Sequence, residues 1–315
     1  MGKEGSGLSL KFVDLFCGIG TIRMGMEQAG HECVYSVEWD KHKRKIYSII
    51  FGGEPEGADI RAVRADDIPR SDVWTFGAPC QDFSIVGKRA GMQGERSSLI
   101  SEVFRLIRET PEEHRPKYIL YENVKGMLSS NKGFDYLEIL YQMDSLGYDT
   151  ERDLLNSKNY GVPQNRERVF TIGHLRTKPW TKVFPIFSDM GCENPAVTLT
   201  ARGYGGQRNG TYVVENPINL RLLIPGADAQ RVYDGRMLGR TLKGESGGQG
   251  GKMGLYLIDD RIRQLTPKET WRLQGIADEI TDRVAAAGIS DTQMYRGSGD
   301  ACTVNAIYEI AKKLT

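Results

Sequence analysis

The sequence predicts an α/β protein built on a mostly parallel, doubly wound sheet. Short apolar runs, which are typical of buried strands, alternate with segments that are typical of helices. A glycine-containing turn, Cys17-Gly18-Ile19-Gly20, joins the first strand to the first helix. A chain of 315 residues, of which 39% are hydrophobic, is long enough for one large domain and a smaller one.

The N-terminal segment has the order strand, turn, helix, strand, helix. Leu10–Phe16 is an apolar strand, and the helix Thr21–Ala29 follows the turn. A second short strand, Cys33–Val37, precedes a basic helix that runs from Lys41 to about Ile50. This is the order of a βαβ unit.

Three more strands and two more helices continue the pattern. The strands are expected at Val73–Phe76, Tyr118–Tyr121 and Arg168–Ile172. The helices are expected near Ser97–Arg108 and Phe134–Leu146. Because strands and helices alternate along the chain, most of the strands should be parallel.

Composition excludes several classes of protein. No apolar run approaches the roughly 18 residues that span a bilayer, and Met1–Ser9 is polar and glycine-rich, unlike a secretion signal. We therefore expect a cytoplasmic protein with no membrane contact. The five cysteines are widely spaced and predict neither a disulfide framework nor a zinc site. Since the net charge is +1, any nucleic-acid binding must come from local clusters of Lys and Arg.

Residues after the first two strands describe a pocket for an adenosine group. The turn Gly18-x-Gly20 lacks the third glycine of the dinucleotide fingerprint and is weak evidence alone. Glu38 ends the second strand, where a carboxylate accepts hydrogen bonds from ribose hydroxyls. Trp39 either stacks on adenine or belongs to the core, and Asp66-Asp67-Ile68 either binds the adenine amine or forms a solvated turn. Because the sequence contains no phosphate-binding loop, S-adenosylmethionine fits better than a dinucleotide.

A lone cysteine follows the apolar run Val73–Ala78, in Pro79-Cys80-Gln81. Parallel sheets present reactive groups at this edge, so Cys80 is a candidate nucleophile, although free cysteine also serves as a small buried hydrophobe. Glu122 ends a neighbouring strand and either handles a proton or is structural. Arg166 and Arg168 share one face and either hold a polar ring or phosphate or are surface charge.

These blocks resemble, in order and spacing, the motif series of the DNA cytosine-5 methyltransferases over nearly the whole chain. The matching blocks are Asp14-Leu15-Phe16-Cys17-Gly18-Ile19-Gly20, Glu38-Trp39, Asp67-Ile68, Pro79-Cys80-Gln81-Asp82-Phe83-Ser84, Glu122-Asn123-Val124 and Gln164-x-Arg166-x-Arg168. Arg263–Glu269 with Leu273-Gln274-Gly275 resembles the ninth motif of that family, and Gly297–Ile307 resembles the tenth. The resemblance implies a Rossmann-like methyltransferase domain with a small, loop-rich, mostly β target recognition domain.

The resemblance also implies a mechanism. Cys80 would add as a thiolate to carbon-6 of a cytosine flipped out of duplex DNA, and Glu122 would act on the ring nitrogen. Arg168 would hold the ring carbonyl, with Arg166 in the same catalytic set. The implied contacts to S-adenosylmethionine are Phe16, Gly18, Ile19, Gly20, Glu38, Trp39, Asp67, Ile68, Pro79, Leu99 and Asp300.

Two segments are predicted to meet DNA. Ser84–Ser98 resembles the mobile catalytic loop of the family, with contacts from Ser84, Val86, Lys88, Arg89 and Arg96. The segment 175–257 is glycine-rich and carries eleven Lys and Arg against six Asp and Glu, which predicts a small basic domain. Its implied DNA contacts are Arg202, Gln207, Arg208, Gln230, Thr241, Lys243 and Gln249.

These features predict three parts of the chain. Residues 1–174 form the catalytic and cofactor-binding domain, 175–258 form the target recognition domain, and 259–315 complete the first domain. One residue departs from the family pattern, because Asp300 stands where the tenth motif usually has asparagine. A carboxylate accepts a hydrogen bond but does not donate one as the amide does, so this departure could alter cofactor affinity.

Two alternatives to an active DNA methyltransferase are disfavoured. The related tRNA-methylating branch shares the catalytic blocks, but the 80-residue recognition segment and the absence of a Cys-Phe-Thr tripeptide argue against it. A non-catalytic DNA-binding relative does not explain the presence of Cys80, Glu122 and both arginines. We expect a monomer that binds double-stranded DNA, and the sequence leaves open whether a cognate restriction endonuclease is a further partner.

Overall fold

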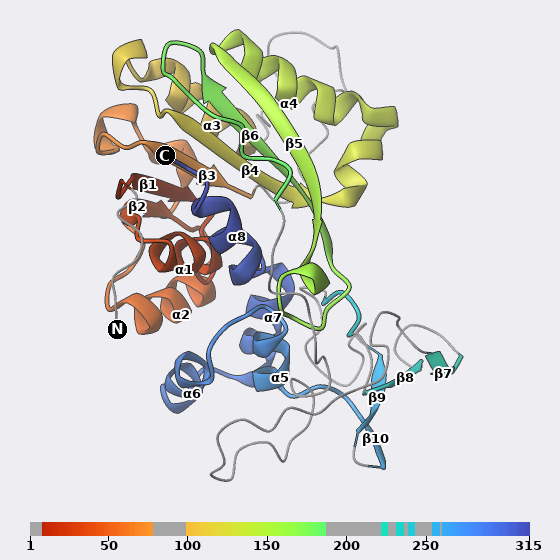
Figure 1. Ribbon diagram of the computed structural model, residues 1–315. Coiled ribbons are helices and arrows are strands. Elements are labelled where there is room, and N and C mark those ends of the chain that lie inside the picture. The colour runs from red at the N-terminus through yellow and green to blue at the C-terminus, as the bar shows by residue number, and fades with distance from the viewer. Residues whose placement is uncertain are drawn as a thin grey trace, which may run out of the picture.

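A six-stranded sheet forms the centre of the structure, and helices cover both of its faces (Figure 1). The computed structural model describes residues 8–77, 99–186, 222–225, 231–235, 239–242, 254–258 and 260–315. The strand order is β2-β1-β3-β4-β6-β5. The strands are β1 (Lys11–Leu15), β2 (Glu32–Val37), β3 (Val73–Phe76), β4 (Tyr118–Val124), β5 (Tyr148–Asn156) and β6 (Glu167–Leu175).

The sheet is mixed, because one of its six strands breaks the predicted parallel arrangement. The strands β2, β1, β3 and β4 are parallel to one another as predicted, whereas β6 is antiparallel to both β4 and β5. The predicted strand Arg168–Ile172 lies within β6, but sequence reasoning misses β5. Because β5 is an edge strand rich in charged residues, such as Glu151 and Asp153, it lacks the apolar run of a buried strand.

Helices in the described part of the chain fall into two layers and a C-terminal group. They are α1 (Thr21–Gln28), α2 (Lys41–Phe51), α3 (Leu99–Glu109), α4 (Phe134–Ser145), α5 (Pro267–Arg272), α6 (Asp278–Ala286), α7 (Asp291–Asp300) and α8 (Val304–Ala311). Short 3₁₀ segments lie at Ile60–Ala62, Ala65–Asp67, Glu112–His114, Lys125–Gly133 and Ser157–Asn159. None of these helices has the length and apolar character that crossing a membrane requires.

Alternating side chains bury both faces of the sheet. On β4, Ile119 and Tyr121 pack with α3 and α4, whereas Tyr118 and Leu120 pack with α1 and α8. All four side chains are at most 1% exposed. Because successive residues of a strand point to opposite faces, a central strand of such a sheet is a continuous apolar run.

The C-terminal segment returns to the first strand-turn-helix unit. Helix α8 lies against α1, where a Cβ atom added to Gly25 would lie only 2.6 Å from Cβ of Ile307. The backbone N–H of Cys302 donates to Oγ1 of Thr21 at 3.1 Å. Helices α5, α6 and α7 share an apolar cluster with α2 that contains the fully buried Trp271. The first and last described ranges therefore share one core.

A second, four-stranded sheet lies beside the C-terminal helices (Figure 1). Its order is β10-β9-β8-β7, and its strands are β7 (Leu222–Ile224), β8 (Val232–Asp234), β9 (Leu255–Ile258) and β10 (Arg261–Arg263). Strand β10 lies beyond the boundary predicted at residue 258. Much of the segment 175–258 falls outside the described residues, so its organisation as a recognition domain stays a prediction.

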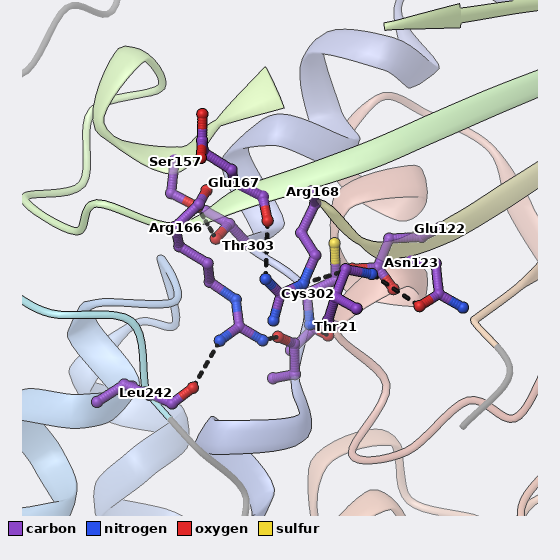
Figure 2. Close-up of polar contacts among 12 residues, drawn as sticks. Thr21, Glu122, Asn123, Ser157, Arg166, Glu167, Arg168, Leu242, Cys302 and Thr303 are labelled. Atoms are coloured by element: carbon purple, nitrogen blue, oxygen red, sulfur yellow. Dashed lines mark hydrogen bonds and ion pairs between the residues drawn. The ribbon is translucent and has the colours of Figure 1, made fainter. Parts of the chain in front are cut away.

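A buried arginine joins three separate parts of the chain. Arg166 precedes β6 and is 1% exposed. Its Nη1 donates to the carbonyl of Leu242 at 2.9 Å (Figure 2). Its Nη2 donates to the carbonyls of Gly299 and Ala301 at 3.1 and 2.7 Å. Burial lowers the pKa of Arg166 to about 9, so the guanidinium is still charged at neutral pH.

The packing of α8 on α1 predicts that Gly25→Ala destabilises the protein. The added Cβ would meet Ile307 at 2.6 Å and the carbonyl of Val304 at 2.8 Å, and such overpacking costs about 1–3 kcal/mol. Gly53→Ala is the control, because an added Cβ there meets nothing within 4 Å. Thermal unfolding followed by circular dichroism should show a lower midpoint for Gly25→Ala alone. Equal midpoints for the two variants would contradict this packing.

The contacts of Arg166 predict that Arg166→Met destabilises the protein by about 3 kcal/mol or more, since three buried carbonyls lose their donor. The stability of Arg166→Lys should lie between those of the unaltered protein and Arg166→Met, because one ammonium does not reproduce the forked donors of the guanidinium. The exposed Arg261 provides the control Arg261→Met. Urea unfolding gives the free energies. A stability of Arg166→Met equal to that of Arg261→Met would refute the role assigned to the buried guanidinium.

Candidate active site

A cleft of about 1110 Å³ lies where the sheet strands β1, β3 and β4 end and β6 begins. Each strand connection supplies part of its wall: Phe16 and Gly18 follow β1, Glu38 follows β2, Gly77 follows β3, and Glu122 lies near the end of β4. The end of α7 and the residues after it also line the cleft. Because α/β sheets place ligand sites at the carboxyl ends of their parallel strands, this cleft is the candidate active site.

Glu38 holds the turn between β1 and α1. Its side-chain Oε2 accepts the backbone N–H of Gly18 at 2.8 Å, and Oε1 accepts the N–H of Asp40 at 2.8 Å. Gly18 has φ +60°, a left-handed conformation that favours glycine. Each carboxylate oxygen has a second lone pair, so the buried Glu38 can also accept hydrogen bonds from hydroxyls of a ligand in the cleft.

Phe16 is held in a strained conformation at the wall of the cleft. Its φ is 61°, which is rare for a residue with a side chain and costs about 1–3 kcal/mol. The neighbouring N–H of Cys17 donates to the carbonyl of Val37 at 2.9 Å, and this bond ties the turn to β2. Strained backbone of this kind concentrates at functional sites, which agrees with the position of Phe16.

Some of the predicted cofactor residues that the structure describes lie outside the lining of this cleft. Trp39 is 66% exposed, with the guanidinium of Arg61 4.9 Å from its ring centre, so the alternative that it is a core residue is wrong. Asp67 pairs with Arg64 at 3.0 Å, and the hydrogen bonds from Arg64 hold the pKa of Asp67 below its ordinary value. Asp67 therefore lies in a turn with a charge partner of its own.

Three other predicted cofactor residues act in packing. Ile68 is buried, and Leu99 packs against the same core. Gly20 precedes α1 with φ +86°, and a Cβ there would collide with the ring of Phe51 at 2.2 Å. Ile19, in contrast, lines the cleft, where it lies 3.2 Å from the position that a Cβ on Gly297 would take.

Glu122 and Arg168 form an ion pair inside the cleft (Figure 2). Arg168 Nε lies 3.0 Å from Glu122 Oε1, and both side chains are at most 15% exposed. In the antiparallel pair β4–β6, Glu122 is opposite Phe170, which places Arg168 at the diagonal position on the same face. The arginine also donates to the carbonyl of Glu167 at 2.8 Å. The pair thus presents a carboxyl group and a guanidinium side by side.

Gly77 brings the end of β3 against this ion pair. A Cβ on Gly77 would lie 3.0 Å from Oε2 of Glu122, which is tighter than ordinary contact. Cys80 follows Gly77 by three residues, but Pro79 and Cys80 lie outside the described residues. The position of the predicted nucleophile within the cleft is therefore a prediction.

The cysteines within the described ranges are poor nucleophiles. Burial raises the pKa of Cys17 and of Cys302 well above the ordinary thiol value, and it raises the pKa of Cys33 to about 12. Each of these thiols is protonated at neutral pH and is a weak nucleophile. Cys17 and Cys302 line the cleft, yet this chemistry gives them a packing role.

The two predicted catalytic arginines have different contacts. Arg168 reaches Glu122, whereas the guanidinium of Arg166 donates to three backbone carbonyls. Arg166 thus holds the segment 239–242 and the end of α7 against β6. In the same junction, the hydroxyl of Thr241 donates to the carbonyl of Asn165 at 2.6 Å, and Thr241 lines the cleft.

Most predicted DNA contacts fall outside the described part of the chain. These are Ser84, Val86, Lys88, Arg89, Arg96, Arg202, Gln207, Arg208, Gln230, Lys243 and Gln249. Their roles stay predictions.

Sequence reasoning missed Lys43 and Arg296, which line the cleft beside the predicted Asp300. The signal for Lys43 was its place in the first turn of a basic helix, directly after the acidic end of β2. Arg296 is four residues before Asp300 in the same block of sequence. Within the described ranges, no cluster of His, Cys, Asp and Glu suits a metal ion.

Comparison with known proteins identifies the family. The family model of the C-5 cytosine-specific DNA methylases matches residues 10–204 and 206–315. The chain is 33% identical to the type II methyltransferase M.HhaI of Haemophilus parahaemolyticus over 314 residues, covering 96% of this chain and 93% of that protein. It is 32% identical to M.HpaII of Haemophilus parainfluenzae, covering 96% of this chain and 88% of that protein.

The fold is also found in solved structures. The Dnmt2 methyltransferase of S. pombe superimposes with a TM-score of 0.71 at 18% identity, covering 96% of this chain and 97% of that one. The methyltransferase EhMeth of Entamoeba histolytica gives a TM-score of 0.71 at 17% identity, with the same coverage. The family match over nearly the whole chain and the agreement in fold lead to one conclusion: the chain belongs to the C-5 cytosine-specific DNA methylases.

Proposed function

We propose that this protein transfers the methyl group of S-adenosylmethionine to carbon-5 of a cytosine in double-stranded DNA, with Cys80 as the nucleophile. The observation that carries the proposal is the Glu122–Arg168 pair, which shares one cleft with Glu38 and touches the chain at Gly77. Cys80 follows Gly77 by three residues, and three residues span at most about 11 Å. One cleft thus offers groups for a cofactor and groups for a cytosine.

The cofactor side of the cleft fits a nucleoside better than a phosphate ester. Glu38 offers carboxylate oxygens suited to ribose hydroxyls, and Phe16 and Ile19 offer apolar surface. A negative carboxylate at this position disfavours a phosphate in the same place. When bound, S-adenosylmethionine supplies a methyl group activated by its sulfonium. Glu38, Phe16, Ile19 and Asp300 are the residues proposed to hold it.

The catalytic side fits the activation of a cytosine ring. The Cys80 thiolate forms a bond to carbon-6, and the electron pair of the ring double bond moves toward the ring nitrogen and carbon-5. Glu122, once protonated, donates a proton or hydrogen bond to that nitrogen, and Arg168 donates to the ring carbonyl. Carbon-5 then takes the methyl group, and the donor leaves as the neutral thioether S-adenosylhomocysteine. Carbon-5 passes its proton to water, the ring nitrogen returns its proton to Glu122, and the bond between carbon-6 and Cys80 breaks with its electron pair going to the sulfur. This cycle restores the thiolate.

A cytosine in duplex DNA reaches such a cleft only after it is flipped out of the stack, at a cost of a few kcal/mol. We propose that the loop Ser84–Ser98 and the recognition segment 175–258 bind the DNA backbone and bases. The type II methyltransferases among the relatives support a role in restriction-modification. A cognate endonuclease would then be the partner that acts on the same DNA site.

The proposed chemistry predicts a trapped covalent complex. A duplex with 5-fluorocytosine at its target sites, incubated with S-adenosylmethionine, should become covalently linked to the protein, because fluorine at carbon-5 does not leave as a proton does. Cys80→Ser should give no adduct, whereas Cys33→Ser, at a half-buried cysteine outside the lining of the cleft, should keep it. Denaturing electrophoresis measures the adduct.

Two results would overturn the assignment. An undiminished adduct in Cys80→Ser would exclude that residue as the nucleophile. An adduct formed with fluorocytosine-containing tRNA and with none of a varied set of DNA duplexes would favour the tRNA-methylating branch.

The position of Glu38 predicts that Glu38→Ala weakens binding of S-adenosylmethionine by about tenfold or more, since it removes a buried, charged acceptor. DNA binding should change much less. Glu38→Gln, which keeps one acceptor, should fall between, and the exposed Glu54 provides the control Glu54→Ala. Isothermal titration calorimetry and a DNA mobility shift measure the two affinities. Equal losses in both would count against the ribose assignment.

A further inference from the structure

Two ion pairs connect α2 to α7 at the wall of the cleft. Lys43 Nζ lies 2.8 Å from Asp300 Oδ2, and Arg296 Nη2 lies 3.0 Å from Asp40 Oδ2. Asp40 and Lys43 are three residues apart at the start of α2, and Arg296 and Asp300 are four residues apart on α7. Residues at these spacings share a helix face, so the two faces meet through two opposite-charge contacts.

The position of Lys43 is fixed by its surroundings. The Asp40 side chain caps α2 by accepting the backbone N–H groups of His42 and Lys43 at 2.8 and 3.1 Å. The Lys43 side chain is only 18% exposed, compared with 48% for Arg296 and 39% for Asp300. A lysine side chain that is mostly covered by protein therefore lines the cleft, with the Asp300 carboxylate beside its ammonium. Partly exposed ion pairs contribute little to stability, so stability alone does not explain this arrangement.

The pair lies close to the turn that Glu38 holds. A Cβ on Gly297, in α7, would lie 3.2 Å from Ile19, so α7 packs directly on the Gly18–Gly20 turn. Lys43, Asp300 and Glu38 line the same cleft. A ligand whose ribose binds Glu38 is therefore within reach of the Lys43–Asp300 pair.

The charges of S-adenosylmethionine indicate which end of the molecule would contact the Lys43–Asp300 pair. The base and ribose of S-adenosylmethionine are uncharged, whereas its amino-acid end carries a carboxylate and an ammonium. We propose that Lys43 binds that carboxylate and Asp300 binds that ammonium, an inference that rests on the proposed cofactor. Asp300 lacks the donor of the asparagine expected at its position, and Lys43 supplies donors in its place.

Three ligands, titrated into the full chain without DNA, separate the contribution of the ligand carboxylate from that of the ligand ammonium. S-adenosylmethionine carries both charges of the amino-acid end, decarboxylated S-adenosylmethionine keeps only the ammonium, and 5′-methylthioadenosine carries neither. Isothermal titration calorimetry gives each affinity, and thermal unfolding checks that each variant is folded. The exposed Lys45, in the same helix, provides the control Lys45→Ala, which removes the same charge.

Lys43→Ala should weaken binding of S-adenosylmethionine by about tenfold or more, because a charge-assisted contact is lost. It should change binding of decarboxylated S-adenosylmethionine and of methylthioadenosine less than about twofold, a change within 0.4 kcal/mol at the usual conversion of about 1.4 kcal/mol per tenfold. Asp300→Asn should weaken both sulfonium ligands and leave methylthioadenosine unchanged. Lys45→Ala should change none of the three.

Several outcomes would overturn the inference. Equal losses for all three ligands in Lys43→Ala would mean that Lys43 supports the cleft as a whole, and no loss for any would remove it from binding. A loss specific to S-adenosylmethionine in Arg296→Ala, without one in Lys43→Ala, would assign the carboxylate to Arg296. Failure of the unaltered protein to bind S-adenosylmethionine would refute the proposed cofactor itself, a result distinct from the others.

Discussion

The arrangement of the cleft depends on the hydrogen bonds that the buried guanidinium of Arg166 donates. It donates to carbonyls from the segment 239–242 and from the end of α7, and it is itself attached to the start of β6. A charge that is 1% exposed loses its hydration, and here backbone dipoles take the place of water. Because three distant segments share these hydrogen bonds, displacement of one of them leaves buried polar groups in the others without partners.

The position of Arg168 also depends on Arg166. It lies two residues after Arg166, and the antiparallel register of β6 on β4 places it diagonally across from Glu122. The two arginines look equivalent in sequence, yet the terminal nitrogens of Arg166 join distant segments, whereas Arg168 reaches the carboxyl group in the cleft. Geometry alone separates these roles, since the charge and the residue type are identical.

The proposed cofactor side of the cleft is likewise assembled from distant parts of the chain. Glu38 ends β2 and ties the turn after β1, while α7 approaches the same turn from the C-terminal segment. The ion pair Lys43–Asp300 lies between these elements. The carboxylate of Asp300 is thus matched by a cation on another helix, and this pair of opposite charges suits the proposed ligand, which carries charges of both signs.

The sequence alone determined the family, the alternation of strands and helices, and the candidate groups Cys80, Glu38, Glu122 and Arg168, because motif spacing and apolar periodicity are local properties. It missed β5, whose charged edge-strand sequence carries no apolar run. Tertiary structure decided the antiparallel pairing of β6, the exposure of Trp39 and the split roles of Arg166 and Arg168. It also brought Lys43 to Asp300. These outcomes depend on which segments meet across the fold, and that depends on packing between residues that are distant in the sequence, such as Glu122 and Phe170 or Lys43 and Asp300.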